Sequence, residues 1–152
     1  MLSVTRVTHS PEETEALGEQ LAATLKPGAV IALCGGLGAG KTCFTRGLMR
    51  GVAVTDAVTS PTYTIINTYR GILSGGVPIG IYHIDAYRLQ GADDFANIGG
   101  EDLLAENAVC VVEWPERIAP LLPADTITVT ISVKPGDERE IAIHCGPPEL
   151  KA

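Results

Sequence analysis

Hydrophobic positions along the chain recur with the two periods that mark strands and helices. Residues 2–8 alternate between polar and apolar side chains, which predicts an edge strand, and Ala29–Cys34 is a short apolar run typical of a buried strand. Between these two runs, Leu17, Leu21 and Leu25 recur at a helical interval and share one face. We therefore expect a helix between the two strands.

Signals for the two ends of this helix flank its apolar face. Ser10 is a favoured N-cap residue, Pro11 suits the first helical position, and Glu13 lies three residues after the cap, as in a capping box. The run Lys26-Pro27-Gly28 ends the helix and turns the chain into the next strand.

Two pairs of strand-like runs are each joined by a turn, which predicts two antiparallel hairpins. The first pair is Tyr63–Tyr69 and Pro78–Asp85, on either side of a turn at Leu73–Gly76. The second pair, Asp125–Lys134 and Arg139–Cys145, flanks a Pro-Gly-Asp turn.

A continuous apolar run lies between the two hairpins. Ala108–Glu113 ends in a carboxylate, as a buried parallel strand does, and residues 93–106 before it predict one or two short helices broken at Gly99-Gly100. No repeat or linker interrupts the chain, so we expect one domain over residues 1–152 with a frayed tail at 146–152.

The composition is that of a folded protein, and it limits the possible partners. With 152 residues, 45% of them hydrophobic, the chain is large enough for a three-layer α/β core. No apolar stretch reaches the roughly 18–20 residues of a membrane span. Residues 1–9 lack the apolar region of a signal peptide, so we expect a cytoplasmic protein. The net charge of −7, without a Lys/Arg cluster, disfavours direct nucleic-acid binding, and action on RNA would need a partner.

One segment carries a complete phosphate-binding motif. Residues 35–42 read G-x-x-x-x-G-K-[ST], between the second strand and a predicted helix over Phe44–Arg50. Glycines let backbone N–H groups turn toward phosphate oxygens, Lys41 supplies a cation for the β- and γ-phosphates, and the Thr42 hydroxyl suits Mg²⁺. The helix that begins near Gly40 directs its N-terminal dipole at the same anion. The predicted nucleotide-binding residues are Gly35, Gly36, Leu37, Gly38, Ala39, Gly40, Lys41, Thr42 and Cys43.

The four cysteines show no spacing suited to zinc. Cys34, Cys110 and Cys145 lie in strand-like runs, which favours small core residues over reactive thiols. Cys43 falls on the first turn of the helix after the motif, where a redox role is the less favoured alternative.

Two acidic residues stand where predicted strands end. Asp85 follows the run 79–84, and Glu113 follows the run 109–112. Ligands of open α/β sheets bind at the carboxyl ends of strands, where the phosphate-binding loop also lies. Acidic groups there hold Mg²⁺ or orient a water for attack on the γ-phosphate. The candidate catalytic residues are therefore Lys41, Asp85 and Glu113.

Three further features near the motif stay open. Thr59–Thr64 is either a loop that senses Mg²⁺ and the γ-phosphate or a polar turn fixed by Pro61. His83 shares a strand face with Asp85, and a structural role is favoured over a catalytic one. Trp114 is either a core anchor or a lid over the nucleotide. The chain lacks the Asn-Lys dipeptide of guanine-specific switch proteins, which favours adenine.

Three sequence blocks accompany the phosphate-binding motif: SPTYT at 60–64, YHIDAYRL at 82–89 and VEWPER at 112–117. In this order, the four blocks resemble the TsaE (YjeE) family, the bacterial ATPase of tRNA N6-threonylcarbamoyladenosine biosynthesis. The resemblance covers residues 10–134. It implies a P-loop NTPase-like fold, in which a mixed sheet has parallel central strands and antiparallel hairpins at its edges.

The resemblance also implies ligands and partners. Members bind ATP with Mg²⁺ and work with the TsaB–TsaD pair, which attaches the threonylcarbamoyl group to adenosine 37 of tRNAs that read ANN codons. The member itself does not perform the transfer, and its ATP binding and hydrolysis reset or drive the cycle of the complex. We therefore expect slow intrinsic turnover that partners activate, and contact with tRNA only through the complex.

The same resemblance assigns site residues and shows two departures. The metal-side residues are Thr42, Thr62, Asp85 and Glu113, and those that approach the adenosine are Pro11 and Thr14. Family members usually have Asp or Asn where Gly36 stands and often a second Thr where Cys43 stands. A glycine leaves the loop more mobile, and a thiol is a weaker donor to the α-phosphate, so ATP binding should survive in weakened form.

Two other functions would also use this motif. A freestanding small-molecule kinase needs an acceptor site and an Arg-rich lid, whereas the arginines here are scattered. A nucleotide-dependent interaction switch without useful turnover differs from the favoured function only in whether hydrolysis matters.

Overall fold

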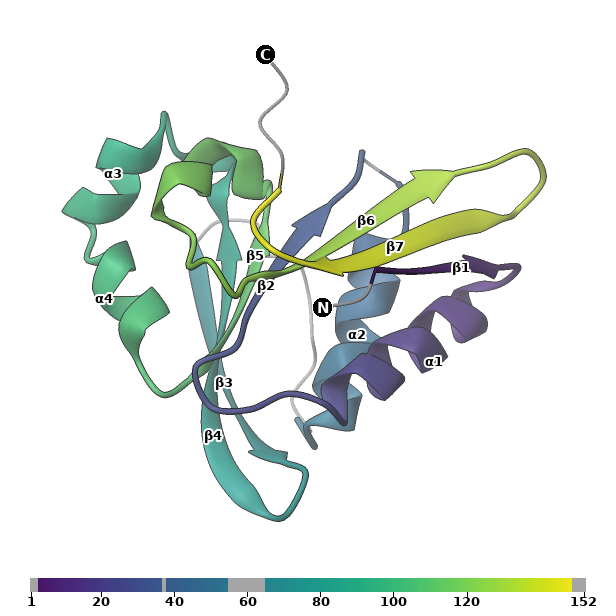
Figure 1. Ribbon diagram of the computed structural model, residues 1–152, viewed down its shortest axis with the longest axis horizontal. Coiled ribbons are helices and arrows are strands. Elements are labelled where there is room, and N and C mark those ends of the chain that lie inside the picture. The colour runs from purple at the N-terminus through teal and green to yellow at the C-terminus, as the bar shows by residue number, and fades with distance from the viewer. Residues whose placement is uncertain (1–2, 37, 55–64, 149–152) are drawn as a thin grey trace.

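Strands from both halves of the chain assemble into one mixed sheet in the computed structural model, which describes residues 3–36, 38–54 and 65–148. The strands are β1 (Val4–Thr8), β2 (Val30–Cys34), β3 (Ile66–Leu73), β4 (Val77–Asp85), β5 (Val109–Glu113), β6 (Ile127–Val133) and β7 (Arg139–Cys145). Their order in the sheet is β1-β7-β6-β2-β5-β4-β3 (Figure 1).

The centre of the sheet is parallel, and its two edges are antiparallel. β2 pairs in parallel with both β5 and β6, and β4 pairs in parallel with β5. At one edge β3 and β4 form a hairpin. At the other edge β6 and β7 form a second hairpin, and β1 adds to it as the edge strand. The predicted mixed sheet and the predicted edge strand are confirmed.

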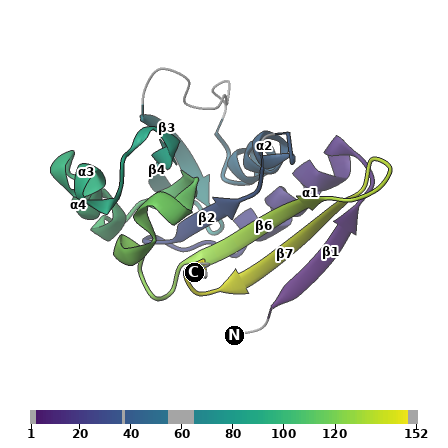
Figure 2. The ribbon, with the colours of Figure 1, turned by 90° about the horizontal axis from the view of Figure 1, so that it is seen from above.

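Helices cover both faces of the sheet and complete three layers (Figure 2). The helices are α1 (Pro11–Ala22), α2 (Lys41–Gly51), α3 (Ala92–Asn97) and α4 (Gly100–Ala105), with the 3₁₀ segments η1 (Ala86–Arg88) and η2 (Pro115–Leu121). β2 serves two cores at once, because successive side chains of a strand point to opposite faces. Ile31 and Leu33 pack with Phe44 of α2, whereas Val30 and Ala32 pack with Phe95 of α3. No helix in the described part of the chain is long and apolar enough to cross a membrane.

The start of α1 forms as its capping signals predict, with one difference. Ser10 is the N-cap, and its side chain accepts a hydrogen bond of 3.1 Å from the backbone N–H of Glu13. The Glu13 carboxylate accepts from the backbone N–H of His9 at 2.9 Å, one residue before the cap. Both bonds satisfy donors at the helix start that would otherwise have no intrahelical partner.

The end of α1 comes earlier than the predicted stop at residues 26–28. The helix ends at Ala22, and the Leu21 carbonyl accepts both the backbone N–H of Thr24, at 3.0 Å, and its hydroxyl, at 2.7 Å. A side chain that bonds to the backbone in this way competes with the helical pattern. Leu25 lies beyond the helix but is still buried, so its apolar side chain belongs to the core without belonging to the helix.

Other boundaries differ from the predicted ones because pairing partners decide them. β3 extends to Leu73, where it still pairs with Val77 of β4, and begins at Ile66. The start of the predicted strand, residues 63 and 64, lies outside the described residues. α2 begins at Lys41, which confirms the predicted helix start near Gly40. The predicted break between two short helices is confirmed by Gly99, which caps α4.

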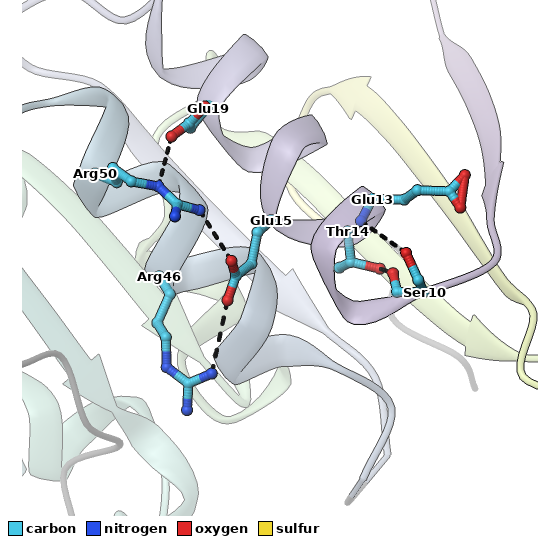
Figure 3. A network of polar contacts seen from close by, with 7 residues as sticks. All are labelled: Ser10, Glu13, Thr14, Glu15, Glu19, Arg46 and Arg50. Atoms are coloured by element: carbon cyan, nitrogen blue, oxygen red, sulfur yellow. Dashed lines mark hydrogen bonds and ion pairs between the residues drawn. The ribbon is translucent and has the colours of Figure 1, made fainter.

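Two glycines let α1 and α2 pack backbone against backbone. A Cβ atom at Gly47 would overlap the carbonyl oxygen of Glu15, and one at Gly18 would overlap that of Phe44. On the exposed side of this contact, Glu15 forms ion pairs with Arg46, at 3.8 Å, and with Arg50, at 2.9 Å (Figure 3). The start of α1 is thereby fixed beside the start of α2, where the phosphate-binding motif ends.

Candidate nucleotide-binding site

The phosphate-binding motif forms the turn between β2 and α2, and its glycines are required by the backbone. Gly38 and Gly40 have φ angles of 75° and 108°, in a region that side chains disfavour. At Gly35 a Cβ atom would lie 2.8 Å from the carbonyl oxygen of Ile131 in β6. Gly40 is the N-cap of α2 and has no side chain with which to cap the helix.

An arginine from the far end of the chain supports the motif. The Nε–H group of Arg139, at the start of β7, donates a 3.1 Å hydrogen bond to the carbonyl oxygen of Ala39, 100 residues away. Sequence reasoning placed Arg139 only at the start of a strand. No local signal marks the contact, because it depends on β7 lying beside β6 and β6 beside β2.

Lys41 is buried in the site without a polar partner. Lys41 is only 7% exposed, and its Nζ has no hydrogen-bond acceptor among the described residues. The ammonium lies over the indole of Trp114, 4.0 Å from the ring centroid, which is a cation–π contact. A buried ammonium with no acceptor is costly, so this arrangement suits an anionic ligand that brings acceptor oxygens.

Trp114 forms a wall of the site. Its backbone is left-handed, with φ 56° and ψ 50°, which non-glycine residues rarely adopt and surrounding contacts must stabilise. The indole is tilted against the ring of Tyr87, with 5.0 Å between the ring centroids. The guanidinium of Arg117 lies over the Tyr87 ring, with Cζ 5.4 Å from its centroid. Trp114 also packs against the core that contains Phe95, so it is a core contact as well as a neighbour of Lys41. Tyr87 was not predicted as a site residue.

The two predicted acids lie side by side. Asp85 at the end of β4 is in register with Glu113 at the end of β5. Glu113 is buried, and its Oε2 lies 2.6 Å from Nε2 of His83, which is itself buried. Asp85 is half-buried and accepts the backbone N–H of Tyr87 at 3.0 Å, which begins η1. The structure thus brings the acids together, and it adds a histidine contact that the sequence left open.

A cavity of about 470 Å³ joins these groups. It is lined by motif residues between 38 and 43, by Asp85 and Glu113, and by Tyr87 and Trp114. We call it the phosphate-side cavity. Among the described residues, no group of three or more His, Cys, Asp or Glu side chains is placed to hold a metal ion.

A second cavity, of about 480 Å³, meets the first at Gly40 and Cys43. We call it the α1-side cavity, because His9, Ser10, Pro11 and Thr14 from the start of α1 line it opposite Asp137 and Arg139. Thr14 is buried, and its hydroxyl lies 2.8 Å from the hydroxyl of Thr8. The structure therefore places the two residues expected near the adenosine next to the motif.

Comparison with known proteins decides the family. The family model described as "Threonylcarbamoyl adenosine biosynthesis protein TsaE" matches residues 8–141 of the chain. The chain belongs to the TsaE family. This confirms the resemblance inferred from the four sequence blocks.

Curated members and a solved structure cover most of the chain. The TsaE protein of Treponema pallidum is 39% identical over 137 residues, which span 90% of this chain and 97% of that protein. The TsaE protein of Bacillus subtilis is 42% identical over 134 residues, 88% of this chain and 80% of that protein. The crystal structure of Bacillus subtilis YdiB superposes with a TM-score of 0.75 at 36% identity, covering 95% of this chain and 86% of that one.

Two predicted site residues of this TsaE-family chain, Leu37 and Thr62, lie outside the described residues, as does the whole Thr59–Thr64 segment. At Gly36, where the resemblance implied a longer side chain, a Cβ atom would meet nothing within 4 Å. The space for such a side chain is therefore open. Cys43, the other departure, lines both cavities.

The remaining cysteines are only partly as predicted. Cys110 is buried, and burial together with the nearby Glu106 charge raises the pKa of its thiol to about 12. Cys34 is half-buried, and burial, with a smaller effect of Glu116, raises its pKa to about 11. Cys145 is exposed, so its predicted place in the core is wrong. It is the last residue of β7, where it pairs with Ile127 at the start of β6.

Proposed function

We propose that this TsaE-family protein binds ATP with Mg²⁺ at the phosphate-binding motif and hydrolyses it. The observation that carries the proposal is the Lys41 ammonium, which is buried in the phosphate-side cavity without an acceptor among the described residues. The β- and γ-phosphate oxygens of ATP would supply charge-assisted acceptors at that position. The glycines of the motif and the start of α2, whose N-cap is a glycine, support the same ligand, because backbone N–H groups of such a turn and of a helix N-terminus attract anions.

Residues around Lys41 would bind the Mg²⁺ ion and orient the attacking water. Thr42, Asp85 and Glu113 line the same cavity and are oxygen donors of the kind that Mg²⁺ takes alongside nucleotide phosphates. The metal, when bound, neutralises charge on the phosphates. Glu113 is the candidate to orient the attacking water, since its carboxylate is fixed by a short hydrogen bond and faces the motif.

The nucleoside end of ATP would occupy the α1-side cavity. This cavity meets the phosphate-side cavity at the first turn of α2, so one ligand can extend through both. Pro11 offers an apolar surface there, whereas the Thr14 hydroxyl is held by Thr8. Shape would therefore contribute more to adenosine binding than new hydrogen bonds to Thr14.

In the cell, this ATPase would support threonylcarbamoyl transfer to adenosine 37 of tRNA by the TsaB–TsaD pair, without performing the transfer. The relatives named above are described as tRNA threonylcarbamoyladenosine biosynthesis proteins, which supports this placement. The net charge of −7 supports an indirect relation to tRNA, since phosphate neutralisation supplies most non-specific affinity for nucleic acid. We also place the protein in the cytoplasm, on the basis of its similarity to these tRNA threonylcarbamoyladenosine biosynthesis proteins.

Phosphate release from ATP tests the proposal. It should be slow for the isolated chain and should rise when purified TsaB, TsaD and tRNA are added. Fast release by the chain alone would contradict partner dependence. ATP consumption that needs a small-molecule acceptor would instead support the kinase alternative.

Association with the partners provides a second test. Co-elution with TsaB–TsaD is measured with an ATP analogue, with ADP and without nucleotide. We expect binding to differ among the three states, with residues 60–64 as the segment that responds to the γ-phosphate. Equal binding in all three would refute nucleotide control while leaving ATP hydrolysis intact.

A further inference from the structure

The phosphate-side cavity contains two buried, oppositely charged side chains that are not paired with each other. Lys41 is 7% exposed and Glu113 is 6% exposed, and both line the cavity. The Lys41 ammonium has no hydrogen-bond acceptor in the described part of the chain, so Glu113 does not serve as one. Charges attract strongly in a buried site, where water screens them poorly. Their separation therefore needs an explanation.

Each of the two charges has a partner other than the opposite charge. The ammonium lies on the face of the Trp114 indole, 4.0 Å from its centroid. The carboxylate is bonded through Oε2 to Nε2 of His83, at 2.6 Å. The first contact holds the ammonium over the ring face without giving it a hydrogen-bond acceptor. The second fixes one carboxylate oxygen at a defined point, and so it can decide where the acid lies.

The position of His83 follows from the register of the sheet. Asp85 is opposite Glu113, so His83, two residues earlier on the same face of β4, is opposite Val111. The Glu113 carboxylate thus bonds to a residue two positions before the one that lies directly opposite it on β4. His83 is only 1% exposed, which leaves its ring little freedom to follow a moving acid.

The hydrogen-bond inventory of the imidazole agrees with this role. A carboxylate only accepts, so the short contact assigns the hydrogen of the ring to Nε2. Nδ1 is buried and has no partner among the described residues. A ring with its one hydrogen on Nε2 keeps a lone pair at Nδ1, so no buried N–H group is left without an acceptor.

We propose that His83 is a positioning residue that holds the Glu113 carboxylate away from the Lys41 ammonium. The lysine is thereby kept available for an anion, and the acid is kept at the edge of the cavity beside Asp85. That the anion is a nucleotide phosphate rests on the proposed function. The separation of the two charges does not.

Two substitutions at His83 distinguish positioning from core filling. In His83→Gln the side-chain amide can place an N–H donor where Nε2 stood, whereas His83→Leu fills a similar volume without a donor. In His83→Leu we expect Glu113 to move onto Lys41 and compete with phosphate. Affinity for ADP, titrated by calorimetry without Mg²⁺, should fall about tenfold in His83→Leu and stay within about threefold of wild type in His83→Gln.

Thermal unfolding of the two variants shows whether their ADP affinity follows their stability, as it would if His83 had only a structural role. Leucine removes buried polar atoms, so His83→Leu should unfold at a temperature at least as high as His83→Gln, although it binds ADP more weakly. If His83 only fills the core, ADP affinity should instead follow stability. Wild-type ADP affinity in a folded His83→Leu variant would overturn the proposal.

A double variant tests the mechanism. In His83→Leu/Glu113→Gln the competing charge is gone, so ADP affinity should return to within about threefold of Glu113→Gln alone. If the tenfold loss persists in the double variant, the carboxylate is not its cause, and the proposal fails.

A readout without nucleotide keeps the proposal separate from the proposed function. The chain has a single tryptophan, so its emission reports on the Lys41–Trp114 contact. Lys41→Met calibrates the emission of the indole without the ammonium. His83→Leu should shift emission toward that of Lys41→Met, and His83→Gln should not. Unchanged emission in His83→Leu would refute positioning, whereas failure of the wild type to bind ADP would refute only the nucleotide assignment.

Discussion

The phosphate-side and α1-side cavities adjoin at the start of α2, yet their polar groups differ in how they are satisfied. In the first, the Lys41 ammonium has only an aromatic ring beneath it. In the second, Ser10 caps α1, Thr14 is bonded to Thr8, and Arg139 is bonded to the motif backbone. The Lys41 side chain of the first cavity therefore has spare capacity for a ligand. Ser10, Thr14 and Arg139 of the second are already used to hold the fold, so substitutions of these residues should have different consequences from those of Lys41.

The largest effect is expected at Glu113 in the phosphate-side cavity. If this acid orients water or holds the metal, Glu113→Ala should lower ATP hydrolysis on the order of 100-fold while nucleotide binding changes far less. Phosphate release and calorimetric titration measure the two quantities. The exposed Glu116 provides a matched control, since Glu116→Ala should leave both nearly unchanged. A loss of the circular dichroism spectrum in Glu113→Ala would show a structural acid and would contradict the prediction.

Substitution of Lys41 should weaken ATP binding without unfolding the protein. Lys41→Ala removes the cation from the motif, so ATP affinity should fall at least tenfold, about 1.4 kcal/mol. The free energy of unfolding should change little, because loss of the cation–π contact with Trp114 is offset by removal of a buried ammonium without a hydrogen bond. Lys134→Ala, which removes an exposed ion pair with Glu140, is the control and should leave ATP affinity intact. Unchanged ATP binding in Lys41→Ala, measured by calorimetry, would remove the basis for assigning the motif.

Thr14 should show the reverse pattern. Thr14→Val keeps the volume but leaves the buried hydroxyl of Thr8 without this partner, so unfolding should become easier by about 1–2 kcal/mol. Urea denaturation measures that change, and calorimetry should show a smaller change in ATP affinity. Thr24→Val loses only an exposed bond to Leu21 and is the control. If affinity for ATP falls more than stability does, the contrast between the two cavities is wrong.

Ser10 should give the smallest effect. Ser10→Ala removes the side-chain acceptor at the start of α1 and should cost about 1 kcal/mol of stability. Thermal unfolding should show a modest fall in the midpoint, with ATP affinity close to wild type. Ser74→Ala, in the exposed turn between β3 and β4, should leave the midpoint unchanged. An equal fall in the two variants would remove the capping explanation.

Features encoded by neighbouring residues were predictable from the sequence. The motif at 35–42, the cap at Ser10 and the acids at the ends of their strands each depend on a few adjacent positions. The structure places the cap, the acids and the described residues of the motif as expected. The α1 end was not predictable in this way. Leu25 continues the helical spacing, but the hydroxyl of Thr24 and its bond to Leu21 outweigh that pattern.

Contacts that depend on strand order were beyond sequence reasoning. The bond from Arg139 to Ala39 needs three strands in a particular order, and the bond from His83 to Glu113 needs the register of two parallel strands. The left-handed Trp114 and the 3₁₀ segment after it were likewise not expected, since side-chain patterns do not fix such backbone angles. The long-range bonds from Arg139 to Ala39 and from His83 to Glu113 are the ones that orient the candidate site.

The glycine contact between α1 and α2 has a consequence for how the molecule opens. Because Gly18 and Gly47 bring the two backbones together without side chains between them, separating the helices would expose the closely packed surface of both. Native-state hydrogen exchange should therefore find α1 and α2 as one cooperative unit with a shared protection level. The two walls of the α1-side cavity and the first turn after the phosphate-binding motif would then be gained and lost together, so a nucleotide that contacts either helix would slow exchange in both.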